Sequence, residues 1–258
     1  MTDAESPAPF MRIPCEIRLM IYQNLFDSKG HKVFEIRSVQ PEAYAARSSQ
    51  HNRSSYCIDH SLMRQRTKTT YKLCTDVEIH TSIMSVNRKV YEETTHLLYG
   101  NRTFSFYKDI EAIIPFFSDL TPRTRPLVQE ISLYKQGFVF CRESNRCEWS
   151  NICEFLADKM QLRSLKLIVE GGRPRLGWDD SAQYTLADFI TLSRVAYEPL
   201  EWALQLLEIK GIQKLDISSE IHSIPPPSHS AAMAFFGAFS TSIETGFAEF
   251  LRREMIAA

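Results

Sequence analysis

The chain has 258 residues, of which 44% are hydrophobic and 24% are charged, and its formal net charge is −1. Such a composition is typical of a globular protein with a sizeable core, and the small net charge excludes a global field that would attract nucleic acid or an anionic membrane. No apolar run reaches the roughly 18 residues of a membrane-spanning helix, and the acidic N-terminus does not resemble a signal peptide. We therefore expect an intracellular protein, cytoplasmic or nuclear, that is a monomer by itself.

Residues 10–26 predict an N-terminal helix, preceded by a polar segment, 1–9, that we expect to be disordered. Pro14 suits the first helical turn, where its missing N–H has no partner to lose. Apolar residues then recur every three to four positions and form one stripe: Ile17, Met20, Ile21 and Leu25. The stripe can either pack against a second helix or stay accessible to a partner, and the nearness of the second helix favours burial. A turn at residues 27–30 and a strand at 31–39 follow.

A second helix is predicted from Ser82, a suitable N-cap, to Gly100, which stands where a C′ glycine ends many helices. A strand should follow at residues 103–107. Phe104 and Phe106 would face the same side of that strand, because side chains alternate along a strand.

Residues 41–72 are rich in Ser, Arg, Thr and Gln and carry six basic residues against two acidic ones. We interpret them as a flexible, solvated insertion, with a phosphorylation-tuned or anion-binding loop as the alternative. Residues 72–79 are a candidate strand that would pair with residues 32–39.

The rest of the chain repeats a strand followed by a helix. Four segments share one pattern of apolar positions, and their central residues are Phe104, Ile131, Leu165 and Leu215. Helical patterns fill the gaps between them at residues 110–117, 149–160, 186–196 and 199–209. This alternation predicts a parallel sheet with right-handed crossovers, in which the four central residues occupy equivalent positions on adjacent strands. It is also the pattern of an irregular leucine-rich-repeat array, which a final helix at 231–255 would cap.

The sequence is not expected to be that of an enzyme, because it lacks the common catalytic motifs. The sequence has no GxSxG, no HExxH and no glycine-rich phosphate loop. One set has the residue types that bind zinc, but its irregular spacing favours unrelated side chains: Cys57, His60, Cys74 and His80. Six cysteines are also too few for a disulfide scaffold. We therefore expect no metal, no cofactor and no enzyme activity; an enzyme of unrecognised type is the weakest alternative.

Two Glu-x-Arg pairs, Glu16-Ile-Arg18 and Glu35-Ile-Arg37, carry a family resemblance. Residues 10–37 resemble the fungal two-ExR domain. Together with the helix at 86–93 and the segment at 97–104, they are also similar to fungal F-box-like proteins. The resemblance covers about residues 10–107.

The resemblance implies a function. In F-box proteins a Leu-Pro-containing first helix docks on the Skp adaptor of a cullin–RING ubiquitin ligase, and leucine-rich repeats hold the substrate. This chain has Ile13-Pro14 in place of Leu-Pro. The residues that would contact the adaptor are those of the first helix: Ile13, Pro14, Ile17, Ile21 and Leu25.

The Glu-x-Arg pairs also have a structural interpretation. Residues two apart on a helix do not face each other, so Glu16 and Arg18 cannot pair, whereas Glu35 and Arg37 share one face of a strand. We interpret the four residues as ion pairs between helix and strand, with partner contact as the alternative.

The expected fold is therefore α+β. An F-box-like module at 10–107, with helices and a short hairpin, continues into a repeat sheet at 108–258. The expected function is protein–protein interaction, as a substrate receptor of a ubiquitin ligase with a Skp-type adaptor and an unknown substrate as partners. An adaptor-independent scaffold of the same family is the alternative.

Overall fold

The computed structural model describes the greater part of the chain, in the ranges 9–27, 30, 32–41, 53–60, 65–74, 79–137, 143–174, 183–224 and 231–256. The segment 1–9, expected to be disordered, lies outside these ranges except for its last residue. The parts 42–52 and 61–64 of the expected insertion also lie outside them.

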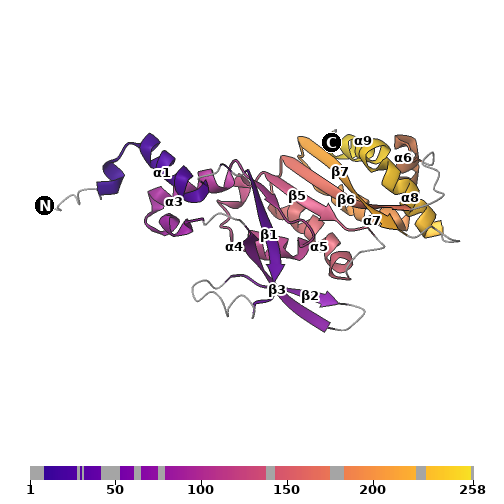
Figure 1. The fold of residues 1–258 in the computed structure, drawn as a ribbon, viewed down its shortest axis with the longest axis horizontal. Coiled ribbons are helices and arrows are strands. Elements are labelled where there is room, and N and C mark those ends of the chain that lie inside the picture. Colours follow the sequence, from indigo (N-terminus) through magenta and orange to yellow (C-terminus); the bar gives the residue numbers. More distant parts are fainter. Residues whose placement is uncertain are drawn as a thin grey trace.

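A mixed seven-stranded sheet organises the described residues, in the order β2-β3-β1-β4-β5-β6-β7 (Figure 1). The strands are β1 (Val33–Val39), β2 (Tyr56–His60), β3 (Gln65–Cys74), β4 (Thr103–Ser105), β5 (Glu130–Lys135), β6 (Ser164–Pro174) and β7 (Lys214–Ile224). Strands β1, β4, β5, β6 and β7 pair in parallel, whereas β3 pairs antiparallel with both β1 and β2. The predicted α+β class is confirmed.

Each predicted helical range contains a helix, although several of the ends differ from the prediction. In the N-terminal half they are η1 (Pro9–Arg12), α1 (Cys15–Asp27), η2 (Thr81–Ser85), α3 (Arg88–Tyr99), η3 (Ile110–Ala112), α4 (Ile113–Asp119) and η4 (Arg125–Leu127). In the C-terminal half they are α5 (Glu143–Lys159), α6 (Leu186–Arg194), η5 (Glu198–Leu200), α7 (Glu201–Leu206), α8 (Ala231–Ser242), η6 (Ile243–Phe247) and α9 (Ala248–Ile256). The η segments are 3₁₀ turns, except η6, which is a π-helical turn.

The central residues of the four segments that share one apolar pattern form a continuous row across the sheet. Phe104 lies opposite Ile131, Ile131 opposite Leu165, and Leu165 opposite Leu215. The prediction of equivalent positions on adjacent parallel strands is therefore confirmed. Phe34 of β1 extends the row, opposite Phe104. All five side chains are buried in one hydrophobic core that runs from α1 to α9.

The second helix begins later than predicted. Residues 81–85 form the 3₁₀ turn η2, and the N-cap of α3 is Asn87, whose side chain accepts a hydrogen bond from Val90 N at 2.9 Å. Ser82 is therefore not the N-cap. Gly100 ends the helix with φ −76°, so it does not adopt the left-handed conformation of a C′ glycine.

The expected insertion contributes two strands where it is described. β2 and β3 form an antiparallel hairpin, and β3 pairs with β1 from Glu35–Cys74 to Val39–Thr70. The predicted pairing with residues 32–39 is thus present, but the strand lies earlier than 72–79. Ile58 and Thr70 are buried. The prediction of a flexible insertion is therefore wrong for the residues of β2 and β3. They are ordered by long-range contacts, which a local sequence pattern does not reveal.

The predicted final helix is broken in two. Thr245 has non-helical φ and ψ of −109° and −106° inside η6, between α8 and α9. The next residue, Gly246, packs directly against the backbone of Tyr184 and Thr185, and a Cβ at this position would overlap the Tyr184 carbonyl oxygen. Glycine is required here because two backbones approach each other closely. None of the helices in the described ranges has the length and apolar character needed to cross a bilayer.

Candidate functional site

Helix α1 lies at one end of the molecule and packs on α3 (Figure 1). Its inner face is formed by Arg18, Tyr22 and Phe26, which are all buried. These residues are four positions apart and therefore share one face of the helix. Tyr22 also contacts Phe10 of η1, with ring centroids 6.0 Å apart. Two aromatic rings and one arginine thus attach α1 to the rest of the fold.

Arg18 is an unusual inward residue because only 3% of its side chain is exposed. Its partner is Glu93 of α3. The guanidinium donates from Nε to Glu93 Oε2 at 3.0 Å and from Nη2 to Glu93 Oε1, and Nη1 donates to the Ile13 carbonyl oxygen. Tyr22 Oη donates to Glu93 Oε2 at 3.1 Å. The bidentate ion pair therefore fixes how α1 is rotated on α3.

The ion pair also shifts the ionisation of its members. Hydrogen bonding from Arg18 lowers the pKa of Glu93 below its ordinary value of 4.5, against the opposing effect of burial. Burial, together with the hydrogen bond to Glu93, raises the pKa of Tyr22. Glu93 is thus ionised and Tyr22 neutral at neutral pH, which is the state in which all these hydrogen bonds can form.

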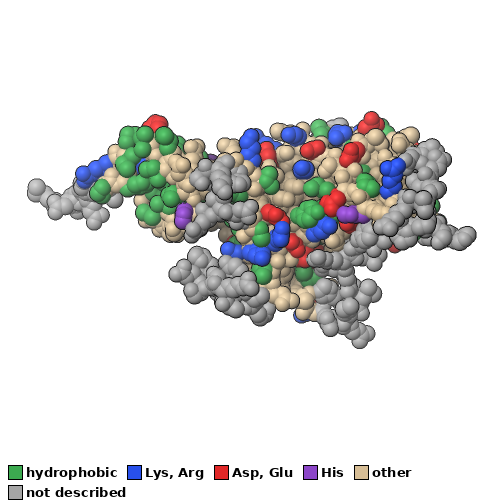
Figure 2. All heavy atoms as spheres, in the orientation of Figure 1, with side chains coloured by type: hydrophobic (Ala, Val, Ile, Leu, Met, Phe, Trp, Pro, Cys, Tyr) green, Lys and Arg blue, Asp and Glu red, His purple; other side chains and the backbone are tan. Residues whose placement is uncertain are grey.

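The outer face of α1 carries accessible apolar side chains next to the exposed polar residues Glu16, Gln23 and Asn24. Ile17 is 46% exposed and Met20 is 58% exposed. Ile13, Ile21 and Leu25 are half-buried, and Pro14 is exposed. The stripe is therefore only partly buried, and the expectation of burial is wrong for Ile17 and Met20. We call the predicted contact residues together with Met20 the α1 apolar surface: Ile13, Pro14, Ile17, Met20, Ile21 and Leu25. Figure 2 shows hydrophobic side chains gathered over this end of the molecule.

The expected ion pairs between helix and strand do not form. Arg18 pairs with Glu93, and Arg37 pairs with Glu35 on its own strand, with Nε 2.6 Å from Oε1. Glu16 is exposed. Glu93 could have been recognised from the sequence, because it lies along the buried face of α3. A glutamate in such a position needs a cationic partner.

The residues of the possible zinc set are spread over β2, β3 and the residue that precedes η2. Cys57 lies opposite Lys68 in the hairpin, Cys74 lies opposite Glu35, and His80 is exposed. The side chain of His60 lies outside the described part of the structure. Within that part, no three His, Cys, Asp or Glu side chains are grouped so that they could hold a metal ion.

A second surface is the side of the parallel sheet that carries the polar residues of each strand. Lys166 and Asp216 are exposed on it, whereas α8 packs on the opposite side, where Ser240 contacts Gly171. Figure 2 shows acidic and basic side chains interspersed over the region of β5, β6 and β7. We call this the open sheet face.

A charged cluster lies on the open sheet face near the carboxyl ends of the strands. Its centre is the buried Glu170, which accepts a hydrogen bond from Gly137 N at 3.1 Å. His222 Nε2 lies 3.3 Å from Glu170 and 3.1 Å from Glu220, and Lys108 Nζ lies 3.9 and 3.8 Å from the same carboxylates. Such a fixed arrangement of both charges suits polar contacts with a partner.

The sequence contained a signal for this cluster. Glu170 and Glu220 each follow, by five positions, a central apolar residue of the shared frame, and they lie opposite each other in the sheet. His222 is two residues further and shares the face of Glu220. If the alignment of the repeated strands had been extended past their apolar positions, it would have placed Glu170, Glu220 and His222 next to one another.

These features define a mixed α/β protein with an apolar helix face at one end and an open polar sheet face. The chain belongs to the family described as a domain of unknown function (DUF7730), whose model matches residues 3–207. The match therefore includes α1, α3 and the strands β1 to β6. No curated protein and no solved structure matches the chain.

Proposed function

We propose that the protein is a protein–protein interaction protein that docks through the α1 apolar surface on the Skp-type adaptor of a cullin–RING ubiquitin ligase. The observation that carries the proposal is the division of α1 into two faces. Arg18, Tyr22 and Phe26 attach the helix, so Ile17 and Met20 are not needed for the core and are available to a partner. Exposed apolar side chains that cluster in this way mark interaction sites.

The open sheet face would hold the substrate in this arrangement. It is distant from α1 along the molecule (Figure 1) and offers polar and charged side chains. One partner could therefore occupy each surface at the same time, as a receptor that links a substrate to a ligase requires.

A pull-down tests the proposal. The tagged protein should capture a purified Skp-type adaptor together with its cullin. Ile17→Asp should weaken capture by roughly tenfold or more, because a charge would have to be buried in an apolar contact. The matched control is Ile256→Asp on α9, whose side chain is 41% exposed and lies outside the α1 apolar surface. Absence of adaptor from the wild-type capture would refute adaptor docking.

An adaptor-independent scaffold is the second candidate, and the connection between the helices favours it. An F-box packs its helices consecutively, whereas here β1, β2 and β3 lie between α1 and α3 in the chain. Under this proposal the α1 apolar surface binds a different protein. Capture of the same partner by wild type and Ile256→Asp, its loss from Ile17→Asp, and no binding of the adaptor would distinguish the scaffold from the receptor.

A further inference from the structure

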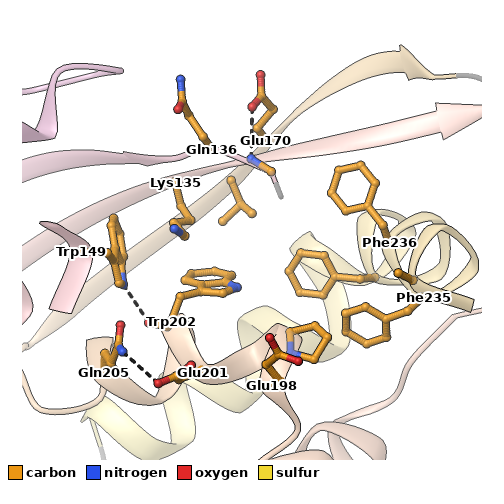
Figure 3. Close-up of a pocket in the computed structure, with 15 residues that line it drawn as sticks. Lys135, Gln136, Trp149, Glu170, Glu198, Glu201, Trp202, Gln205, Phe235 and Phe236 are labelled. Atoms are coloured by element: carbon orange, nitrogen blue, oxygen red, sulfur yellow. Dashed lines mark hydrogen bonds between the residues drawn. The ribbon is translucent and has the colours of Figure 1, made fainter. Parts of the chain in front are cut away.

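A cavity of about 370 Å³ lies between the ends of β5 and β6 and the helices that cover this side of the sheet. Its aromatic walls come from α5, α7 and α8: Trp149, Trp202, Phe235, Phe236 and Phe239. The two indoles meet edge to face at 78°, and Trp149 Nε1 donates a hydrogen bond to the Trp202 carbonyl oxygen at 2.8 Å. Phe235 and Phe236 stand across the cavity from Trp202 (Figure 3). The volume and the largely aromatic lining are typical of a small-molecule site.

The charged side chains of the lining come from different sides of the cavity. Lys135 comes from the sheet, whereas Glu198 and Glu201 come from η5 and α7 on the other side (Figure 3). Glu170 also belongs to the lining, but its carboxylate points away from the aromatic rings and lies 3.9 Å from Lys108 Nζ, in the charged cluster of the open sheet face. The cavity therefore has one cationic side and one acidic side.

The ammonium group of Lys135 is already held by groups of the protein. Only 7% of Lys135 is exposed, and its Nζ donates a hydrogen bond to Asn145 Oδ1 at 3.3 Å and lies 4.7 Å from the ring centroid of Trp149. The fixed charge repels a cationic group of a ligand, and this repulsion directs the group to the opposite, acidic side of the cavity.

The carboxylates of Glu198 and Glu201 supply that acidic side. Both residues are exposed. Glu201 accepts a hydrogen bond from the neutral amide of Gln205 at 3.5 Å, and within the described ranges neither carboxylate forms an ion pair. Carboxylates attract an ammonium group by charge, and the faces of neighbouring aromatic rings attract it by cation–π interaction. The acidic side of the cavity combines both features.

We propose that this cavity binds an arylalkylammonium ion, in which a short alkyl chain joins an aromatic ring to a protonated amine. The ring would pack among the indole and phenyl rings, which favour offset and edge contacts with another ring. The ammonium group would remain at the solvent-exposed side and donate charge-assisted hydrogen bonds to Glu198 and Glu201. Lys135 would keep its bond to Asn145. The site is separate from the α1 apolar surface and does not depend on the proposed docking.

Isothermal titration calorimetry with two matched probes tests the proposal. Tryptamine and tryptophol share an indole ring and a two-carbon chain, which ends in an ammonium group in the first and a hydroxyl group in the second. The wild type should bind tryptamine more tightly, by roughly three- to tenfold, because exposed ion pairs contribute modestly. The double variant Glu198→Gln/Glu201→Gln should remove this preference, because glutamine keeps the size without the charge. The control Glu208→Gln removes an exposed carboxylate that follows α7 outside the cavity lining and should keep the preference.

A third variant, Ala232→Trp, tests whether the probes bind in the cavity. Ala232 is an exposed residue of α8 that lines the cavity, so a large side chain there should block it without disturbing the core. This variant should melt like the wild type and lose both probes. Absence of binding in the wild type, equal binding of the two probes, a preference retained by the double variant, or binding retained by Ala232→Trp would each overturn the proposal.

Discussion

Arg18 and Glu93 show how a single ion pair decides which face of a helix points outward. The apolar stripe that the sequence indicated passes through Ile17 and Ile21, but the buried face passes through Arg18 and Tyr22, one position further along the helix. One position rotates a helix by about 100°. An arginine on the inner face was not predictable from α1 alone, because its burial depends on Glu93, which is 75 residues away.

The pH dependence of stability follows from the same pair. Because the pKa of Glu93 is lowered by folding, its ionised form stabilises the fold above its ordinary pKa of 4.5, and this stability is lost as the pH falls through the folded value. We predict that Glu93→Gln melts at a lower temperature than wild type at neutral pH. The difference should shrink as the solution is made more acidic than pH 4.5. Thermal melting by circular dichroism across this range measures it.

Glu92→Gln is the matched control for this prediction. Glu92 is adjacent in sequence but exposed, and it pairs with the exposed Arg88 one turn earlier on the same helix. Exposed pairs of this kind contribute little to stability. Its melting curves should follow those of the wild type at every pH. Identical curves for the two variants would mean that Glu93 does not hold α1.

At the scale of elements, α1 should tolerate a charge on one face and not on the other. Ile17→Asp should leave the melting temperature close to that of wild type, because the new carboxylate meets water. Phe26→Asp should lose several kcal/mol of unfolding free energy, because Phe26 is only 1% exposed and the carboxylate would be buried without a partner. Chemical denaturation of the two variants checks this, and a similar loss in both would show that the outer face belongs to the core.

The break between α8 and α9 gives a second prediction for elements. Gly246→Ala should lower the unfolding free energy by about 1–3 kcal/mol, because its Cβ would overlap the backbone at Tyr184. The exposed Glu249→Ala, on the following helix, should change it by less than about 0.5 kcal/mol. Urea denaturation of both variants measures the difference, and equal stability would contradict the close packing of the two backbones.

Elements differed in how far the sequence predicted them. The parallel strands were predictable because each one repeats the apolar frame centred on residues such as Ile131 and Leu165. The hairpin β2–β3 was not, because its ordering comes from distant partners: Tyr56 Oη donates to Glu148 at 2.6 Å, and Tyr71 Oη donates to Asp119 at 2.9 Å. For the candidate site, the sequence indicated the apolar residues of the first helix, but it did not indicate which of them face outward.

At the scale of the whole molecule, one hydrophobic core joins the N-terminal module to the repeat sheet. The family match ends at residue 207, whereas β7 pairs with β6 along its full length, from Ser164–Lys214 to Pro174–Ile224. Residues after 207 also cover the outer edge of β7, because Ser219 N on this strand donates a hydrogen bond to Glu244 Oε1 at 2.8 Å. The residues after 207 therefore complete the sheet.

A truncated chain tests this dependence. Residues 1–207 alone should aggregate or lack a cooperative thermal transition, because β6 would become an uncovered edge and the core would lose its contacts with β7, α8 and α9. Size-exclusion chromatography and thermal melting beside the full chain measure it. A monomeric fragment with a cooperative transition would show that the family-matched segment folds independently.

Calorimetric titration of a purified Skp-type adaptor into the full chain tests the central claim, that α1 presents a docking face which the fold does not use. We predict saturable binding with one adaptor per chain, the same affinity for Ile256→Asp, and a loss of roughly tenfold or more for Ile17→Asp at an unchanged melting temperature. No binding by the wild type, or equal affinity of Ile17→Asp and wild type, would contradict the claim.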